Sequence, residues 1–185
     1  MTRHERRGYV SSPYGQLHYR DNGDPNNRDA ILLLHQTAWS SIQFQGVQQY
    51  LEEASIRSVA VDNPGYGMSD GPADCPTIED YAIAIAPIVD HLGLEQVVIA
   101  GHHTGSSIAA ALAPHLPAQL AGIAMHAPSL YTDEERSALL GMPHFDQTPQ
   151  EDGSHWLKRW EFARSATAGK AKLTSTHLSV SMFFD

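Results

Sequence analysis

Short apolar runs and stretches of helical periodicity alternate along the first two thirds of the chain. Two strand-like stretches, residues 8–11 and 16–21, flank a turn at residues 12–15, whose proline and final glycine predict an antiparallel hairpin. Four further runs are short and mainly apolar: residues 30–34, 59–61, 96–100 and 121–126. The first three are typical of strands that are buried on both faces of a parallel sheet, and the fourth predicts one further strand.

Helical periodicity fills the intervals between these strands. Ser40 or Ser41 can cap a first helix. The apolar residues that follow this cap at helical spacing are Phe44, Val47, Leu51 and Ala54. Residues 106–113 predict a further helix, which Pro114 closes.

The helix between these two carries the clearest boundary signals. Thr77, with Asp80 three residues on, forms a capping box at its start. Gly93 occupies the position of a left-handed residue at its end. Its apolar face consists of Tyr81, Ile85, Ile88 and Leu92. Pro87 lies inside this helix and should kink it, at a cost of up to about 3 kcal/mol.

The order of these elements defines the fold class. A hairpin followed by alternating strands and helices predicts an α/β fold, with a mostly parallel sheet and helices on both faces. From Tyr131 the pattern changes. Trp156, Trp160 and Phe162 share a helical face there, and residues 178–184 form an apolar, strand-prone stretch. We therefore divide the chain into a core at residues 1–130 and a second segment at residues 131–185.

Composition narrows the class of protein. The net charge of −9 argues against nucleic-acid binding, which needs clustered Lys and Arg. No apolar run reaches the roughly 18 residues of a membrane span, and the N-terminal residues lack the apolar stretch of a signal peptide. Cys75 is the only cysteine, which fits a reducing compartment. These features predict a cytoplasmic protein whose partners are neither nucleic acid nor membrane.

Candidate chemistry lies where the predicted parallel strands end, at residues 35–37, 62–67 and 101–105, because ligands bind at the carboxyl ends of such strands. The third segment, Gly101-His102-His103-Thr104-Gly105, stands directly between a strand and a helix. Its two glycines permit a turn too tight for side chains, which holds the central residue in a strained conformation above the sheet. The following helix N-terminus supplies free N–H groups suited to an oxyanion.

Four segments together resemble the α/β-hydrolase family: residues 32–37, 62–70, 77–81 and 98–105. The resemblance covers about two thirds of the chain. It implies that residue 103 occupies the nucleophile position and that the backbone N–H groups of Thr37 and Thr104 form the oxyanion hole. It also implies that residues 131–185 are part of a helical cap.

The chain departs from the family pattern in three ways. Gln36 replaces the usual glycine after the first strand-end histidine, and His103 replaces the serine of esterases or the aspartate of dehalogenases and epoxide hydrolases. The family's acid and its catalytic histidine follow two later strands, and we expect the chain to end within the cap before either. The dehalogenase and epoxide-hydrolase branches are therefore disfavoured.

A neutral imidazole at position 103 can attack an acyl carbonyl or activate water as a general base. We therefore expect an enzyme that hydrolyses a small, largely apolar ester, lactone or related carbonyl compound through His103, without a cofactor. Two alternatives stay open. One is a non-catalytic protein that binds small molecules in the same pocket. The other is an incomplete hydrolase, in which the strand at residues 121–126 forms an exposed edge that can pair with a second copy.

The remaining candidates have structural interpretations. We expect His102 and His126 to be packed in the core, and His35 to orient the oxyanion loop. Asp62 should fix the turn that follows it. Ser106 and Ser107, in the first turn of a helix, should satisfy backbone groups and not act as nucleophiles. The chain has eleven histidines but no His-Glu-x-x-His pattern or Cys/His cluster, so no metal site is expected.

Overall fold

The computed structural model describes residues 5–141 and 150–167, which fall into two compact units that divide between Ser129 and Leu130. The first unit is built on a six-stranded sheet in the order β1-β2-β4-β3-β5-β6. Its strands are β1 (Arg6–Ser12), β2 (Gly15–Asn22), β3 (Asp29–Leu34), β4 (Arg57–Val61), β5 (Gln96–His102) and β6 (Leu120–His126). The β1-β2 and β2-β4 pairs are antiparallel, and the other pairs are parallel. The predicted hairpin and mostly parallel sheet are thus confirmed.

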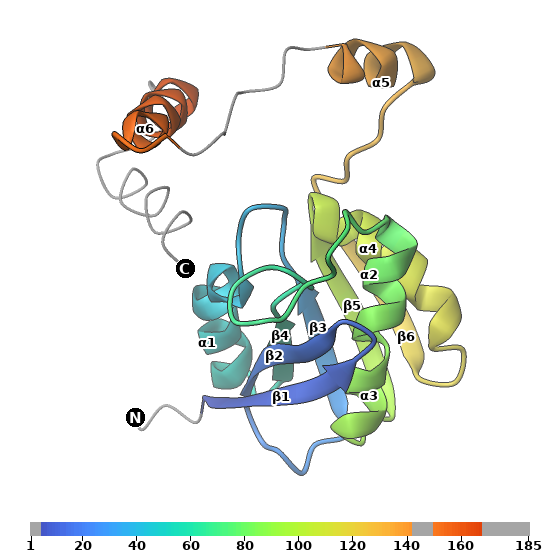
Figure 1. Ribbon diagram of the computed structural model, residues 1–185. Coiled ribbons are helices and arrows are strands. Elements are labelled where there is room, and N and C mark those ends of the chain that lie inside the picture. The colour runs from blue at the N-terminus through green and yellow to red at the C-terminus, as the bar shows by residue number, and fades with distance from the viewer. Residues whose placement is uncertain (1–4, 142–149, 168–185) are drawn as a thin grey trace. The chain divides into compact units, whose positions relative to one another are not determined.

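Helices cover both faces of this sheet, as predicted. Figure 1 shows α1 (Gln45–Glu53) on one face and α2 (Ile78–Ile85), α3 (Pro87–His91) and α4 (Thr104–Leu112) on the other. Short 3-10 turns precede α1 at Ser41–Phe44 and follow α4 at Ala113–His115. The main core lies between the sheet and the three helices of the second group. Fully buried side chains there include Leu32, Ile85, Ile88, Ile99 and Ile108.

The predicted capping box and the proline break are both present. The Thr77 hydroxyl accepts a hydrogen bond from the Asp80 N–H, and the Asp80 carboxylate accepts one from the Thr77 N–H. Pro87 divides the predicted helix, because it becomes the first residue of α3, where a missing N–H leaves no hydrogen bond unmade. Gly93 takes the expected left-handed conformation, with φ of 60°.

The predicted apolar face of the first helix was wrong in part, because Phe44 is buried and Leu51 half-buried whereas Val47 and Ala54 are exposed. Val47 is 46% exposed, whereas the buried residue of α1 is Gln48. The Gln48 amide donates hydrogen bonds of 3.1 Å to the carbonyls of Arg20 and Ser58. The 3-10 turn that ends at Phe44 has three residues per turn, so it shifts the phase of the helix that follows.

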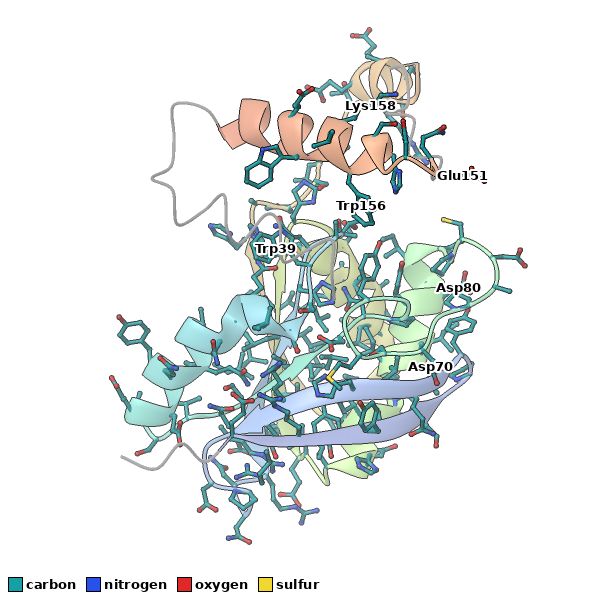
Figure 2. All side chains as sticks on the ribbon, turned by 60° about the vertical axis from the view of Figure 1, so that its left-hand side comes forward. Trp39, Asp70, Asp80, Glu151, Trp156 and Lys158 are labelled. Carbon is teal, nitrogen blue, oxygen red and sulfur yellow. The ribbon has the colours of Figure 1, made fainter. Side chains whose placement is uncertain are left out.

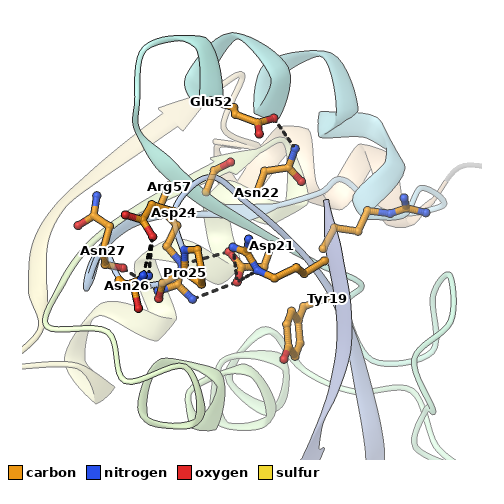
Figure 3. Close-up of polar contacts among 12 residues, drawn as sticks. Tyr19, Asp21, Asn22, Asp24, Pro25, Asn26, Asn27, Glu52 and Arg57 are labelled. Atoms are coloured by element: carbon orange, nitrogen blue, oxygen red, sulfur yellow. Dashed lines mark hydrogen bonds and ion pairs between the residues drawn. The ribbon is translucent and has the colours of Figure 1, made fainter. Parts of the chain in front are cut away.

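Polar contacts hold the amino-terminal edge of the parallel strands (Figure 3). Arg57, at the start of β4, forms a two-pronged ion pair with Asp21 of β2, with both N–O distances at 3.0 Å. The same guanidinium donates to the carbonyls of Pro25 and Asn27 in the loop before β3. Arg57 and Asp21 are both buried. Because both charges are paired and hydrogen-bonded, their burial is compatible with a stable core.

The loop after β4 is tied to the hairpin. Asp70 lies beside the hairpin (Figure 2), and its carboxylate accepts a 2.8 Å hydrogen bond from the Gln16 N–H. The Ser69 hydroxyl donates to the Asp62 carbonyl and accepts from the His18 N–H. These bonds position the turn that follows β4 at the carboxyl end of the sheet.

The strand predicted at residues 121–126 is present as β6, and it is largely exposed. In β6, Ile123 is 39% exposed and Met125 is 47% exposed. The strand lies at the edge of the sheet, where no described strand pairs with its outer side. Within residues 5–129, α4 is the helix that packs most closely on β6.

The second unit contains α5 (Asp133–Leu140) and α6 (Ser154–Thr167). On α6, Trp156 is 39% exposed and Trp160 is 38% exposed, while the Phe162 side chain and residues 178–184 lie outside the described part of the chain. None of the described helices is long and apolar enough to cross a membrane.

Candidate active site

The turn between β5 and α4 has the geometry of a nucleophile elbow. His103 stands alone between strand and helix, with φ of 51° and ψ of −115°, a conformation that residues with side chains rarely adopt. A Cβ on Gly101 would collide with the Gly105 carbonyl, and a Cβ on Gly105 would collide with the Leu34 carbonyl. Both glycines are therefore required for the backbone to close, which leaves the His103 side chain exposed at the tip.

Backbone strain is concentrated around this turn. Four non-glycine residues in the described part of the chain have positive φ: Ala38, Ser55, His103 and Ala127. Three of the four follow the ends of β3, β5 and β6. Since strained residues persist only where surrounding structure holds them, the carboxyl edge of the sheet is the best candidate for a functional site.

The structure brings together the three site residues that the sequence predicted. Thr104 Oγ1 lies 3.2 Å from His103 Nδ1 and accepts a 2.8 Å hydrogen bond from the Thr37 hydroxyl. The Thr37 N–H also donates to Thr104 Oγ1, at a longer distance of 3.4 Å. The Thr104 N–H is at the first position of α4 and has no partner within the helix. The two predicted oxyanion-hole residues therefore contact each other directly beside the imidazole.

One further residue reaches His103 and was not predicted. Ser129, in the loop after β6, places its hydroxyl oxygen 3.3 Å from both Nδ1 and Nε2 of the imidazole. The His103 N–H also donates to the carbonyl of His126, the last residue of β6, at 2.9 Å. In the sequence, the position of Ser129 shortly after the end of a predicted parallel strand was the only feature that could have marked it as a site residue.

His35 supports the loop that carries Thr37. Its ring is completely buried, and Nε2 accepts a 2.9 Å hydrogen bond from the Asn63 N–H. The proton is therefore on Nδ1, which donates to the Gln36 carbonyl at 2.7 Å. Burial lowers the pKa of His35 to about 4, although the bond to Gln36 opposes this shift. The neutral ring thus links the loops after β3 and β4, in agreement with its predicted orienting role.

Asp62 fixes the turn after β4, as the sequence indicated. Its side-chain partner, His18, was not predicted. The Asp62 carboxylate contacts His18 Nδ1 at 2.8 Å and accepts hydrogen bonds from the N–H groups of Ser41 and Met68. Burial would raise the pKa of Asp62, but these hydrogen bonds outweigh it and hold the pKa at about 2. His18 precedes Asp62 by 44 positions, and only the pairing of β2 with β4 brings them together.

The predictions for His102 and His126 were wrong in part. His126 is exposed and His102 is half-buried, because β6 is an uncovered edge strand. The two residues are direct neighbours across β5 and β6, and their Nδ1 atoms are 2.7 Å apart. Burial lowers the pKa of His102, and the neighbouring His126 lowers it further. Both rings line an open cavity of about 400 Å³, whose other walls include Leu33, Phe44 and Met125.

Ser106 has the structural role expected of it. It is completely buried, and its hydroxyl lies 2.8 Å from the Gly101 carbonyl and 3.2 Å from the His126 carbonyl. It therefore joins the elbow to the end of β6. Within residues 5–141 and 150–167, no group of three His, Cys, Asp or Glu residues could hold a metal ion.

Comparisons with known proteins assign the family. The sequence profile of the α/β-hydrolase fold matches residues 29–177, which is most of the chain. The chain therefore belongs to the α/β-hydrolase fold family. The sheet order, the parallel strands and the elbow described above are those of this fold.

Several curated relatives have different activities. The chain is 30% identical over 118 residues to haloalkane dehalogenase 2 of Mycobacterium tuberculosis, which covers 63% of this chain and 40% of that protein. It is 31% identical over 99 residues to a bifunctional esterase/perhydrolase of Acinetobacter calcoaceticus, which covers 53% of this chain and 36% of that protein. The chain thus spans about two fifths of the length of the curated relatives it matches.

Solved structures show the same fold. An N-acyl homoserine lactonase superposes on 95% of this chain and 64% of its own, with a TM-score of 0.69 and 19% identity. An epoxide hydrolase from an endophytic Streptomyces covers 65% of this chain and 36% of its own, with a TM-score of 0.60 and 27% identity. The named relatives share the fold of this chain and differ from one another in the reaction that their names give.

Proposed function

We propose that this α/β hydrolase cleaves a small, largely apolar ester, lactone or related carbonyl compound, with His103 acting as nucleophile or general base. The observation that carries the proposal is the exposed imidazole of His103, held at the strained tip of the elbow within 3.3 Å of the Thr104 and Ser129 hydroxyls. An imidazole can serve acyl transfer in either role. The N–H groups of Thr37 and Thr104 would stabilise the oxyanion.

The identity of residue 103 separates this proposal from the activities of some relatives. A carboxylate nucleophile, which displaces halide or opens an epoxide, requires Asp or Glu at the elbow, and this chain has His. An acyl-imidazole, in contrast, hydrolyses readily in water. Among the relatives, the esterase/perhydrolase and the lactonase therefore offer the better guide to the reaction.

Turnover of p-nitrophenyl acetate and butyrate, and of a short-chain lactone, tests the proposal. We expect His103→Ala to abolish hydrolysis, because the only imidazole at the tip of the elbow is removed. His115→Ala is the matched control, since His115 lies at the end of the 3-10 turn after α4, where its Nε2 is 2.7 Å from the exposed Glu79 carboxylate. Unchanged hydrolysis in the His103→Ala protein, with an unaltered circular dichroism spectrum, would contradict the mechanism.

A non-catalytic binding protein is the second candidate. In the described part of the chain, no carboxylate contacts His103, whereas the usual triad logic orients its histidine with an acid. The open cavity beside His102 and His126, with mainly apolar walls, is the feature that would bind a ligand. This alternative predicts saturable binding of apolar esters without turnover above background.

The surroundings of the site lead to three smaller proposals. We infer that α5 and α6 belong to a helical cap, that the free thiol of exposed Cys75 suits a reducing cytoplasm, and that the open edge of β6 pairs with a second copy. Sedimentation over a range of protein concentrations would measure the last of these. A monomer throughout that range would contradict it.

A further inference from the structure

The loop after β6 carries a serine that is placed against the elbow by its own backbone. Ala127 has a φ of 48°, and Pro128 fixes the next φ, so the chain turns sharply as it leaves the strand. The end of β6 is itself attached to the elbow, because the His126 carbonyl accepts a hydrogen bond from the His103 N–H. Ser129 therefore approaches the imidazole from a strained turn, as functional side chains often do.

The Ser129 hydroxyl lies close to both nitrogens of the His103 ring. Its oxygen is 3.3 Å from each of them, which places it over the face of the ring, because an equidistant point in the ring plane would collide with Cε1. Proton transfer therefore requires the imidazole to reorient until the lone pair of one ring nitrogen points at the hydroxyl. Catalytic hydrogen bonds in free enzymes are commonly long or misaligned and tighten when substrate binds.

Thr104 contacts one of the two ring nitrogens. Its hydroxyl oxygen accepts from the Thr37 hydroxyl and, at 3.4 Å, from the Thr37 N–H, and it lies 3.2 Å from His103 Nδ1. The Thr37–Thr104 pair therefore engages the Nδ1 side of the ring, and in the described part of the chain the hydroxyl that contacts Nε2 is that of Ser129.

The other hydroxyls of the site are already engaged. Thr104 Oγ1 is the acceptor for Thr37, and Ser106 is buried with its proton directed at backbone carbonyls. Ser129, by contrast, is half-buried, and its hydroxyl contacts the His103 ring. Of the hydroxyls within hydrogen-bond distance of His103 in the described part of the chain, Ser129 is the one that is not already bonded to another group.

We propose that Ser129 is the nucleophile of this enzyme and His103 its general base, so that the usual positions of the two groups are exchanged. The inference rests on the proposed acyl hydrolysis. The Ser129 O–H bond breaks as its proton passes to His103 Nε2, and the oxygen forms a bond to the acyl carbon. The bond from that carbon to the leaving oxygen then breaks, and the imidazolium returns its proton to the leaving alcohol. Water, deprotonated by the same nitrogen, releases the acid and restores Ser129.

Covalent trapping tests this assignment directly. The full chain is incubated with p-nitrophenyl acetate and, separately, with a fluorophosphonate probe, quenched in acid and mapped by peptide mass spectrometry. We expect one acetyl or phosphonyl group on Ser129, and a loss of at least about 100-fold in kcat/KM for Ser129→Ala, within the range for groups that take part in the chemical step. Ser107→Ala, on α4 but without contact to His103, is the matched control and should retain activity.

The outcomes separate the two proposals. Hydrolysis by Ser129→Ala within about twofold of the parent rate, together with inactivity of His103→Ala, would overturn the nucleophile assignment and leave the proposed function standing. An acetyl group on His103 and none on Ser129 would do the same. Failure of the parent protein to hydrolyse any ester or lactone, with no probe on Ser129, would overturn both.

Discussion

Strands β5 and β6 have similar sequences and opposite surroundings. Each has seven residues, is mainly apolar and ends in a histidine, and the two are paired in parallel. Val97 and Ile99 of β5 are completely buried, whereas every residue of β6 is half-buried or exposed. The difference arises because β5 has strands on both sides and α4 over it, while β6 is an edge. Apolar character therefore indicates a strand but does not determine whether that strand is covered.

The largest expected effect is the difference in stability between a glycine substitution in β5 and one in β6. A methyl group on Gly101 of β5 would collide with the backbone of Gly105 and Ser106, so we expect Gly101→Ala to prevent the elbow from closing and to leave little folded protein. A methyl group at Gly122 of β6 has nothing within 4 Å, so Gly122→Ala should fold normally. Thermal unfolding followed by circular dichroism measures both. Equal melting temperatures for the two variants would show that the elbow tolerates a side chain.

The next effect compares two isoleucines at paired positions, Ile99 of β5 and Ile123 of β6. Ile99→Ala should lower the free energy of unfolding by about 2–5 kcal/mol, because it leaves a cavity in the core. Ile123 is 39% exposed, so Ile123→Ala should cost less than about 1 kcal/mol. Urea titration at matched protein concentration gives both values. A loss at Ile123 as large as that at Ile99 would mean that β6 is covered in solution.

A third comparison concerns histidines at strand ends, buried His35 after β3 and exposed His126 at the end of β6. The pKa of His35 in the folded protein, about 4, lies below its ordinary value of 6.5, so the unfolded chain takes up a proton at a higher pH than the folded protein does. The contribution of neutral His35 to the free energy of unfolding is therefore fully present above about pH 6.5. It should fall by up to about 3 kcal/mol as the pH decreases to 4. Protonation of Asp62 should lower the free energy of unfolding further, but only below pH 3.8, the ordinary pKa of this carboxyl group, and down to about pH 2.

Urea titrations of His35→Gln between pH 7 and 4 would isolate the contribution of His35. We expect the variant to be less stable than the parent at pH 7 and to lose less of its stability on acidification. His126→Gln controls for the removal of one imidazole from an exposed position. A parent-like slope in His35→Gln would mean that other groups produce the acid sensitivity.

Much of the architecture follows from local patterns in the sequence. The hairpin, the capping box at Thr77, the break at Pro87 and the strand–turn–helix at the elbow depend on residues that are close in sequence. Such features are readable because periodicity, capping and backbone conformation are set by neighbouring residues. The family assignment was also possible from these motifs, since the elbow glycines are required by the backbone itself.

The sequence predicted the site residues that belong to the family motifs and missed those that depend on distant contacts. Positions 37, 103 and 104 followed from the motif, and the structure brings their side chains together. Ser129 was missed because nothing in its local sequence marks it, and its contact with His103 depends on a turn after another strand. The pairing of His18 with Asp62 was missed for the same reason.

The sequence by itself determined where the strands and helices lie and that His103 stands at a strained elbow, because these properties depend on glycines, caps and hydrophobic periods within a few residues. Only the tertiary structure decided that Gln48 is buried and Val47 exposed, that His126 lies at an open edge, and that Ser129 meets the imidazole. Burial and contact depend on which elements cover a residue, and distant parts of the chain supply that cover.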